Sequence, residues 1–458
     1  MSSHIFSLEP QPVPKIETAN RLIHTPIPAP GTINVLEELS KIESRSMHGQ
    51  LPIVWDKADD FNIFDMGGNK FIDFTSGIFV ANVGHSNPRI LSYMQKALDK
   101  SLISCYAYPN ELRAEYLKKL NLFTDDHLEK AFLLSAGTEA TEGALKLIRL
   151  HGQKIKKRRL GIICMEGNWH GRTLGAQMMS GNLAQKEWIG YSDSDIHHIP
   201  FPYPWNTEAK DAVDFLEKGL QKLTDQGIDI SQDIAGFMIE TFQGWGAVFY
   251  PPEYIQAIES ICKKYGILLA FDEMQSGFAR TGRKFGYQHY DVKPDLICCG
   301  KGMGGGVPLS GVIGRAEILD LPDIGNMSST HSANPLVCAA GIAVLEEIDS
   351  RNLVAEAARK GDIFFLFLNR IKEKFPLNID LILGKGLIAA MTFKDSATGH
   401  PDGVTASKVS EKCMQKGLLV VHTGRESIKF GPPLTISDAA LAEGLETLSE
   451  SIEEILSL

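Results

Sequence analysis

Between Ala131 and Cys299, apolar runs of strand length alternate with amphipathic stretches of helical spacing. Runs that are apolar almost throughout are typical of strands buried on both faces. The alternation therefore predicts an α/β fold, with a mostly parallel sheet covered by helices. Ligands of such sheets bind at the carboxyl ends of the strands. The expected strands are 131–135, 161–165, 234–240, 266–272 and 295–299, and the expected helices are 139–150 and 252–265.

The segments on either side of this alternation predict additional structure. Six prolines among the first 30 residues indicate that residues 1–50 form an extended arm or are partly disordered. Residues 53–74 predict an antiparallel meander, and residues 88–100 a helix with Asn87 as its N-cap. Beyond residue 335 we expect three helices, the last over 437–458, and a pair of strands. The predicted domains are 1–75 (arm and small-domain segment), 76–335 (large domain) and 336–458 (linking helix and small domain).

Length, charge and cysteine content limit the class of protein. The 458 residues predict two or three domains. A net charge of -10 argues against nucleic acid or an anionic membrane as the main partner. The N-terminus lacks a secretory pattern, and no apolar run reaches membrane-spanning length. Seven scattered cysteines favour reduced thiols in a cytoplasmic protein over disulfides, and their spacing predicts no metal site.

A lysine follows the last expected strand. The run 295–299 leads through Gly300 into Lys301 and a cluster of glycines. Most lysines are solvated, but one at the tip of a buried strand is expected to lose solvent. Desolvation favours the neutral amine, which is a nucleophile toward carbonyl carbons. Lys301 is therefore a candidate to bind a carbonyl cofactor.

Two other strand ends carry complementary groups. Asp272 ends the strand 266–272, where a protonated heterocyclic nitrogen would satisfy its carboxylate. Arg280 or a serine hydroxyl would serve equally well. The turn Ser135–Thr138 opens a helix, so its N–H groups and hydroxyls would suit a phosphate. An ordinary threonine N-cap is the alternative for this turn.

Trp169 and His170 follow a third expected strand, between glycines 167 and 171. The indole can stack on a planar ring or belong to the core, and the imidazole can simply orient its loop. A phosphate site, a carboxylate, an aromatic platform and a buried lysine together predict a site for pyridoxal 5'-phosphate (PLP).

Motifs spread along the chain resemble those of the class III PLP-dependent aminotransferases, the 4-aminobutyrate, ornithine and ω-amino acid group. The resemblance extends from about Ile53 to the C-terminus and implies the PLP-dependent transferase fold type I, with a smaller α+β domain built from both chain ends. It is carried by Gly84-His85, Gly137-Thr138-Glu139-Ala140, Trp169-His170-Gly171-Arg172, Gln243-Gly244, Phe271–Gly277, Arg280-Thr281-Gly282, Gly300-Lys301 and Thr330.

The resemblance implies roles for the matching residues. Lys301 would bind the cofactor's aldehyde carbon and carry the proton between substrate and cofactor, and Asp272 would keep the pyridine nitrogen protonated. Gln275 would bond the phenolic oxygen, while Met274 and Trp169 would pack on opposite faces of the ring.

The remaining contacts would lie around the phosphate and beside the ring. Gly137 and Thr138 would bind the phosphate, joined by Thr330 of the partner subunit, so that a homodimer would be the minimal active unit. Glu240 would support the site beside the cofactor. The predicted cofactor contacts also include Ala136 and His170.

The substrate side departs from the family pattern. In 4-aminobutyrate-type enzymes an arginine reads the carboxylate of the α-amino acid substrate, and a glutamate neutralises it when it is not needed. The position of that glutamate is Trp245 here, and the position of the arginine is Lys429. Lys429 would bind a carboxylate more loosely than arginine. Arg425 is either a replacement or a solvated loop residue.

Aromatic residues also mark the expected substrate side. Phe79, with Tyr106 or Tyr108 and Trp245, would line an entrance for an amine bulkier or less acidic than 4-aminobutyrate, unless these are core residues. Arg149 matches a family arginine but also fits an internal ion pair, so we assign it no substrate role.

The sequence thus predicts a homodimeric aminotransferase that moves an amino group from a primary amine or ω-amino acid to a 2-oxo acid by a ping-pong mechanism. A racemase, epimerase or aminomutase of the same fold is the alternative, because the same site stabilises the same carbanion. A cofactor-binding protein without catalysis is a third possibility, which the intact Lys301, Asp272 and Gln275 argue against.

Overall fold

The large domain is built on a seven-stranded sheet in the computed structural model, which describes residues 4–205 and 211–457. The strand order is β6-β14-β13-β12-β9-β7-β8. β14 (Ser310–Gly314) runs antiparallel to both of its neighbours, and the other strands are parallel to one another. The predicted, mostly parallel sheet is therefore confirmed. Its other strands are β6 (Lys130–Leu134), β7 (Gly161–Met165), β8 (Ile196–Ile199), β9 (Ile234–Glu240), β12 (Leu268–Asp272) and β13 (Leu296–Cys299).

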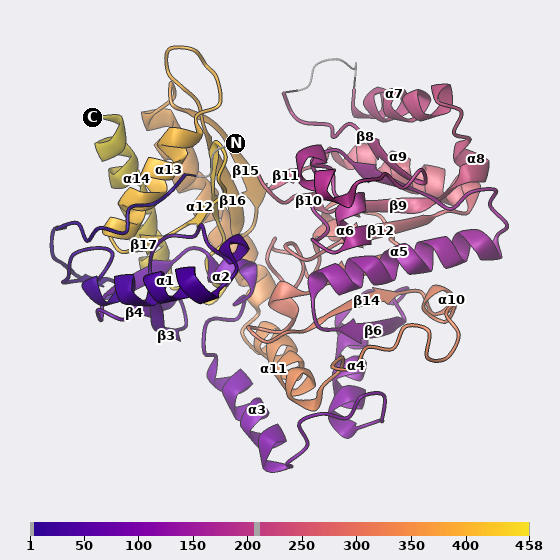
Figure 1. Cartoon of the computed structure of the whole chain (residues 1–458), viewed down its shortest axis with the longest axis horizontal. Helices are drawn as coiled ribbons and strands as arrows, with labels where there is room; N and C mark the ends of the chain where they lie inside the picture. The colour runs from indigo at the N-terminus through magenta and orange to yellow at the C-terminus, as the bar shows by residue number, and fades with distance from the viewer. Residues whose placement is uncertain (1–3, 206–210, 458) are drawn as a thin grey trace.

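Helices cover both faces of this sheet, as Figure 1 shows. Alternate residues of a strand point to opposite faces. Leu268 and Ala270 of β12 therefore join the core beneath α5 (Gly137–Lys154). Leu269 and Phe271 join the core of the other face, together with apolar residues of α7 (Ala212–Asp225) and α9 (Pro252–Tyr265). This two-sided burial explains why the strand sequences are apolar throughout.

The small domain combines both chain ends. The four-stranded sheet β15-β16-β19-β18 comes entirely from the C-terminal part. The second sheet, β1-β2-β5-β4-β3, receives β17 from the C-terminal part, which pairs parallel with β5. The elements are β1 (Ile16–Glu17), β2 (Leu22–Ile23), β3 (Trp55–Asp59), β4 (Asn62–Asp65), β5 (Lys70–Asp73), β15 (Ile379–Lys385), β16 (Ile388–Phe393), β17 (Leu418–Leu419), β18 (Val421–His422), β19 (Ser427–Phe430), α12 (Leu353–Lys374), α13 (Gly403–Gln415) and α14 (Asp438–Leu456).

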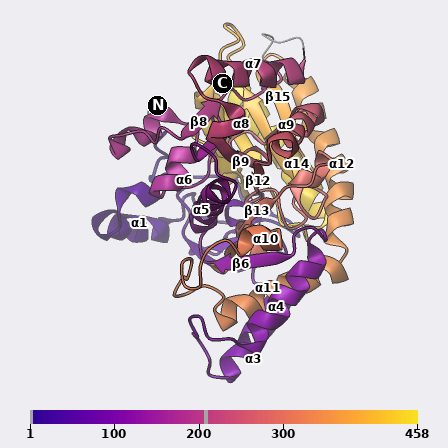
Figure 2. The same cartoon turned by 90° about the vertical axis from the view of Figure 1, so that its right-hand side faces the viewer.

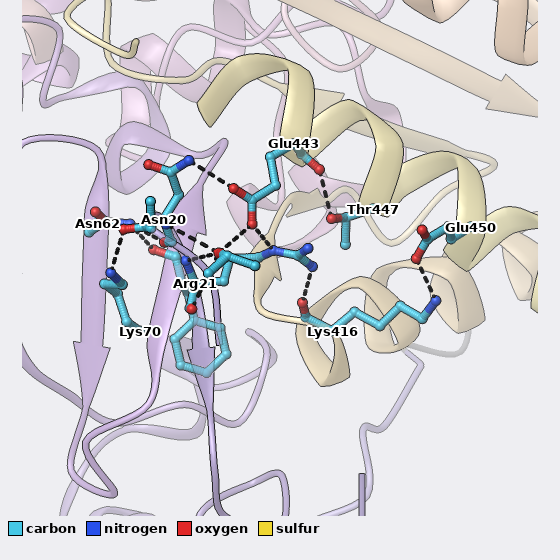
Figure 3. A network of polar contacts seen from close by, with 11 residues as sticks. Asn20, Arg21, Asn62, Lys70, Lys416, Glu443, Thr447 and Glu450 are labelled. Atoms are coloured by element: carbon cyan, nitrogen blue, oxygen red, sulfur yellow. Dashed lines mark hydrogen bonds and ion pairs between the residues drawn. The ribbon is translucent and has the colours of Figure 1, made fainter. Parts of the chain in front are cut away.

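The N-terminal segment is more ordered than its prolines predicted. The predicted extended arm also contains β1, β2 and the helix α1 (Pro30–Ile42), which the sequence did not indicate; residues 1–3 lie outside the described residues. Pro30 begins α1, where the missing N–H costs nothing. In Figure 3, Asn20 and Arg21 donate to the Glu443 carboxylate of α14 at 2.8 and 2.7 Å, which fixes the segment to the small domain.

Asparagine caps begin two helices at the base of the molecule. Asn87 and Asn334 each accept N–H groups at the starts of α3 (Pro88–Asp99) and α11 (Pro335–Ser350), and a proline follows each cap. α11 packs against α3 and α4 (Glu111–Phe123) and reaches α12 of the small domain. Figure 2 shows α3, α4 and α11 together at the end of the molecule.

No helix of the described residues combines the length and apolarity needed to cross a membrane.

Candidate active site

Three ionisable residues lie where neighbouring parallel strands end. β9 ends at Glu240 and β12 at Asp272, and the two residues are register partners. β13 ends at Cys299, and Lys301 follows after one glycine. Because parallel strands place their carboxyl ends at one edge of a sheet, these side chains converge. The structure thus brings together the predicted carboxylate, lysine and supporting glutamate.

Lys301 is the basic group of this cluster. The residue is partly accessible, but protein atoms surround its amine. This desolvation lowers the pKa of Lys301, and the Asp272 and Glu240 carboxylates oppose the shift. The amine forms no hydrogen bond or ion pair with another residue of the described chain. The backbone at Lys301 has a φ of 46°, a left-handed conformation that is strained for a non-glycine residue. The lysine is therefore held as an available amine.

Asp272 is buried, and both of its oxygens are engaged. Oδ2 lies 2.9 Å from Nδ1 of His170, and Oδ1 accepts the N–H of Met274 at 3.0 Å. The His170 ring is fully buried, and its backbone N–H donates to the Ser180 hydroxyl. His170 thus lies against the carboxylate, which it holds in a fixed orientation.

Glu240 is buried beside Asp272. Burial, followed by the neighbouring Asp272 carboxylate, raises the pKa of Glu240 to about 8. Its Oε2 accepts the backbone N–H of Trp169 at 2.9 Å. The glutamate therefore ties the loop that carries Trp169 to the end of β9.

Lys429 of β19 reaches the same edge from the small domain. Its Nζ donates to Oε1 of Gln275 at 2.7 Å and to the carbonyl oxygen of Gly244, and it lies 4.5 Å from the ring centroid of Phe79. The residue is only 4% exposed, and burial lowers its pKa to about 7, with Glu240 opposing and Lys301 adding to the shift. Phe79 is buried as well.

Glycines and a helix start form the floor of the site. A Cβ added at Gly137 or Gly300 would approach the Met274 sulfur to 2.9 or 2.7 Å, so both positions must be small for Met274 to lie between them. α5 begins at Gly137 and runs for 18 residues, so the N–H groups of Gly137 and Thr138 lack acceptors within the helix. The Thr138 hydroxyl lies 2.7 Å from that of Thr173.

Arg425 and Trp245 line a cavity of about 390 Å³ where the two domains meet. The Arg425 guanidinium stacks 3.8 Å from the Trp245 ring centroid, and its only ion pair is with Glu426 at 3.3 Å among the residues described. Tyr203 and Trp205 also line this cavity. Arg425 is thus a half-buried cation on an aromatic platform rather than a solvated loop residue.

Four other residues considered in the sequence lie elsewhere. Tyr106 and Tyr108 are exposed, and Tyr106 lines a different cavity with Arg113, so neither joins Trp245. Thr330 lies in an exposed turn and makes no hydrogen bond within the described chain. Arg149 forms an ion pair with Asp193 at 2.7 Å, which confirms the internal pairing.

Two supporting residues were not assigned a role from the sequence. Oε1 of Gln243 accepts the Trp245 indole N–H at 2.8 Å and also the Tyr203 hydroxyl, so Gln243 positions the aromatic wall. Thr173 links Thr138 to Glu142, whose Oε1 accepts its hydroxyl at 2.7 Å. Gln243 belongs to one of the motifs shared with the class III aminotransferases, so the sequence could have indicated it. Nothing in the sequence indicated Thr173, apart from its position directly after the Trp169–Arg172 motif.

The geometry defines a class of protein, and comparisons with known proteins agree with it. The model of the class III aminotransferase family matches residues 44–452, and the chain belongs to this family. The 4-aminobutyrate aminotransferase of Mycobacterium leprae is 30% identical over 453 residues, which are 95% of this chain and 98% of that protein. The leucine/methionine racemase of Thermococcus litoralis is 32% identical over 437 residues, which are 92% of this chain and 95% of that protein.

Solved structures show the same fold. The taurine:2-oxoglutarate aminotransferase of Bifidobacterium kashiwanohense, in complex with PLP and glutamate, is 26% identical with a TM-score of 0.83. The match covers 92% of this chain and 97% of that chain. The chain therefore has the PLP-dependent transferase fold type I, as the sequence predicted.

The site residues fit PLP. The cofactor requires an available amine, a buried carboxylate and an anion site, and the chain provides Lys301, Asp272 and the start of α5. The chain is a PLP-dependent aminotransferase, which moves an amino group from a primary amine or ω-amino acid to a 2-oxo acid by a ping-pong mechanism.

Proposed function

We propose that Lys301 and Asp272 are the catalytic residues of this aminotransferase. The observation that carries the proposal is a desolvated, unpaired amine at the strand edge where His170 holds a buried carboxylate. When bound, PLP supplies a reactive aldehyde carbon and a ring that accepts electrons. Lys301, as the neutral amine that burial favours, would carry a proton on Nζ from the substrate carbon to the cofactor. Asp272, fixed by His170, holds a proton at the ring nitrogen.

We propose that the residues around Lys301 and Asp272 bind the cofactor. The N–H groups of Gly137 and Thr138, next to Ala136, would bind the phosphate at the positive end of α5. Trp169 and Met274 would pack against the ring, and the Gln275 amide would bond its phenolic oxygen. Glu240, through the Trp169 backbone, and His170, through Asp272, would position these groups.

A single half-reaction separates amino transfer from racemisation, which the similarity to a racemase makes worth testing. We expect that purified holoenzyme given an amine donor and no acceptor converts its cofactor to pyridoxamine phosphate in stoichiometric amount. Absorbance and chromatography of the released cofactor would measure this. Scrambled stereochemistry of a chiral donor with unchanged cofactor would contradict the proposal and favour the racemase alternative.

We propose that Arg425, on the platform of Trp245, reads the substrate carboxylate in place of the family arginine. The guanidinium is only weakly paired with Glu426. It can therefore donate hydrogen bonds to a carboxylate bound in the cavity between the domains. Arg425→Ala is expected to raise KM for a 2-oxo acid about 10- to 100-fold. The matched control is a simple amine donor without a carboxylate, whose KM should stay within about twofold. Equal effects on both substrates would contradict the assignment.

We propose a cytoplasmic homodimer in which Thr330 of the partner subunit completes the phosphate site. Thr330 is exposed and makes no hydrogen bond within the described chain, and all seven cysteines are free. Sedimentation equilibrium tests the assembly: the mass of two chains is expected, and the mass of a single chain would contradict the homodimer. Cell fractionation tests the location, and the protein is expected in the cytoplasmic fraction.

A further inference from the structure

We infer that Lys429 is a positioning residue that acts through Gln275 on the edge of the cofactor, and that it is not the reader of the substrate carboxylate. This inference rests on the proposed function, because it requires Gln275 to contact the cofactor. It assigns a new task to the position at which the family carries its carboxylate-reading arginine.

The contacts of Lys429 are already made within the protein. Nζ donates to Oε1 of Gln275 at 2.7 Å and to the carbonyl oxygen of Gly244. The Phe79 ring lies beside the ammonium, 4.5 Å from its centroid. At 4% exposure, the side chain has little room to reach into solvent. Two of its three possible hydrogen bonds are therefore committed before any substrate binds.

The contact fixes which end of the Gln275 amide is available. Because Oε1 accepts from Lys429, the donating Nε2 is the end left for another partner. Gly244 confines this end, since a Cβ at that position would collide with Nε2. A hydrogen bond from the Lys429 amine, which is charged below its pKa of about 7, also polarises the amide and strengthens its N–H as a donor. Lys429 thus prepares Gln275 to bond an anionic oxygen such as the phenolic oxygen of the cofactor.

Carboxylate reading by Lys429 would undo this arrangement. Because the side chain is only 4% exposed, its third N–H cannot reach a substrate unless Nζ moves away from Gln275 and Gly244, and one partly buried and one buried acceptor would then lose their donor. Arg425 needs no such rearrangement, because it pairs only with its sequence neighbour Glu426 within the described chain. The charges at the site therefore divide their work, with Lys429 on the cofactor side and Arg425 on the substrate side.

The test compares holoenzymes carrying Lys429→Met, Lys429→Arg and a control, Lys360→Met. Lys360 is another buried lysine that donates to a backbone carbonyl, that of Leu434 at 2.9 Å, without touching Gln275. We expect Lys429→Met to weaken cofactor binding about tenfold. We also expect it to raise the midpoint of the pH titration of the cofactor's absorbance by at least about 0.5 pH unit, because the anionic oxygen loses stabilisation. Lys429→Arg should retain most of the cofactor affinity and most of the original titration midpoint. Lys360→Met should change neither the cofactor affinity nor the titration midpoint.

A double-mutant cycle with Gln275→Ala isolates the coupling. The doubly substituted enzyme should bind cofactor no more weakly than Gln275→Ala alone, because Lys429 is inferred to act on the cofactor only through Gln275. Additive effects would overturn the inference, as would a Lys429→Met enzyme with unchanged spectrum and cofactor affinity but a raised KM for the 2-oxo acid. A Gln275→Ala enzyme with normal cofactor binding and spectrum would instead overturn the proposed placement of Gln275, and this inference with it.

Discussion

Replacing Lys301 with alanine is expected to lower kcat at least about 10³-fold, because one side chain both binds the cofactor and transfers the proton. The neighbouring amine of Lys429 is not placed to substitute for it, because it is engaged by Gln275 and Gly244. Steady-state kinetics and single-turnover absorbance of the substituted enzyme with an amine donor measure the loss.

Two controls show that the loss concerns the amine. The Lys301→Ala enzyme should still bind PLP, since the start of α5 and Asp272 remain, which equilibrium dialysis can measure. A small added amine such as methylamine should restore part of the proton transfer. Turnover within tenfold of the unaltered enzyme and without added amine would refute the mechanism.

Replacing Asp272 with asparagine is expected to lower kcat about 10²- to 10³-fold. The amide has the same shape and can still accept the Met274 N–H, but it carries no charge to hold a proton at the ring nitrogen. It also removes the anionic partner of His170. The measurement is kcat at saturating cofactor, so that weaker cofactor binding does not enter the result.

Glu273 provides the matched control for Asp272. It is the adjacent buried carboxylate, and it accepts hydrogen bonds from Thr241, Ser276 and the N–H groups of Gly286 and Tyr287. Glu273→Gln should lower Tm, because the amide loses one acceptor, while kcat of the folded enzyme stays nearly unchanged. If Asp272→Asn behaves like Glu273→Gln, the catalytic role of Asp272 is wrong.

Sequence periodicity was sufficient to predict the framework of the site. β9 and α9 have the predicted bounds, and β12 and β13 end at the predicted residues. Because parallel strands share an edge, Asp272 and Lys301 could be placed together without any structure. The N-terminal segment could not be predicted, since its two-residue strands are stabilised by partners such as Glu443, more than 400 residues away.

The side-chain pairings around the site could not be read from the sequence. Lys429 and Gln275 are 154 residues apart, and His170 and Asp272 are 102 apart. The sequence left open whether Lys429 or Arg425 reads a carboxylate, because the partners of Lys429 are set by the approach of β19 to the large sheet. The stack of Arg425 on Trp245 likewise depends on how the domains meet.

The two tasks of the active site are carried by separate stretches of chain. Asp272 and Lys301 stand at the ends of strands in the large sheet, whereas Arg425 and Lys429 belong to the hairpin of β18 and β19. Substitutions at Arg425 in this hairpin are therefore expected to alter which substrate is accepted and to leave Asp272 and Lys301 in place, whereas substitutions at Lys429 are expected to act on the cofactor side through Gln275. This separation makes Arg425 in the hairpin a favourable target for redesign of substrate recognition.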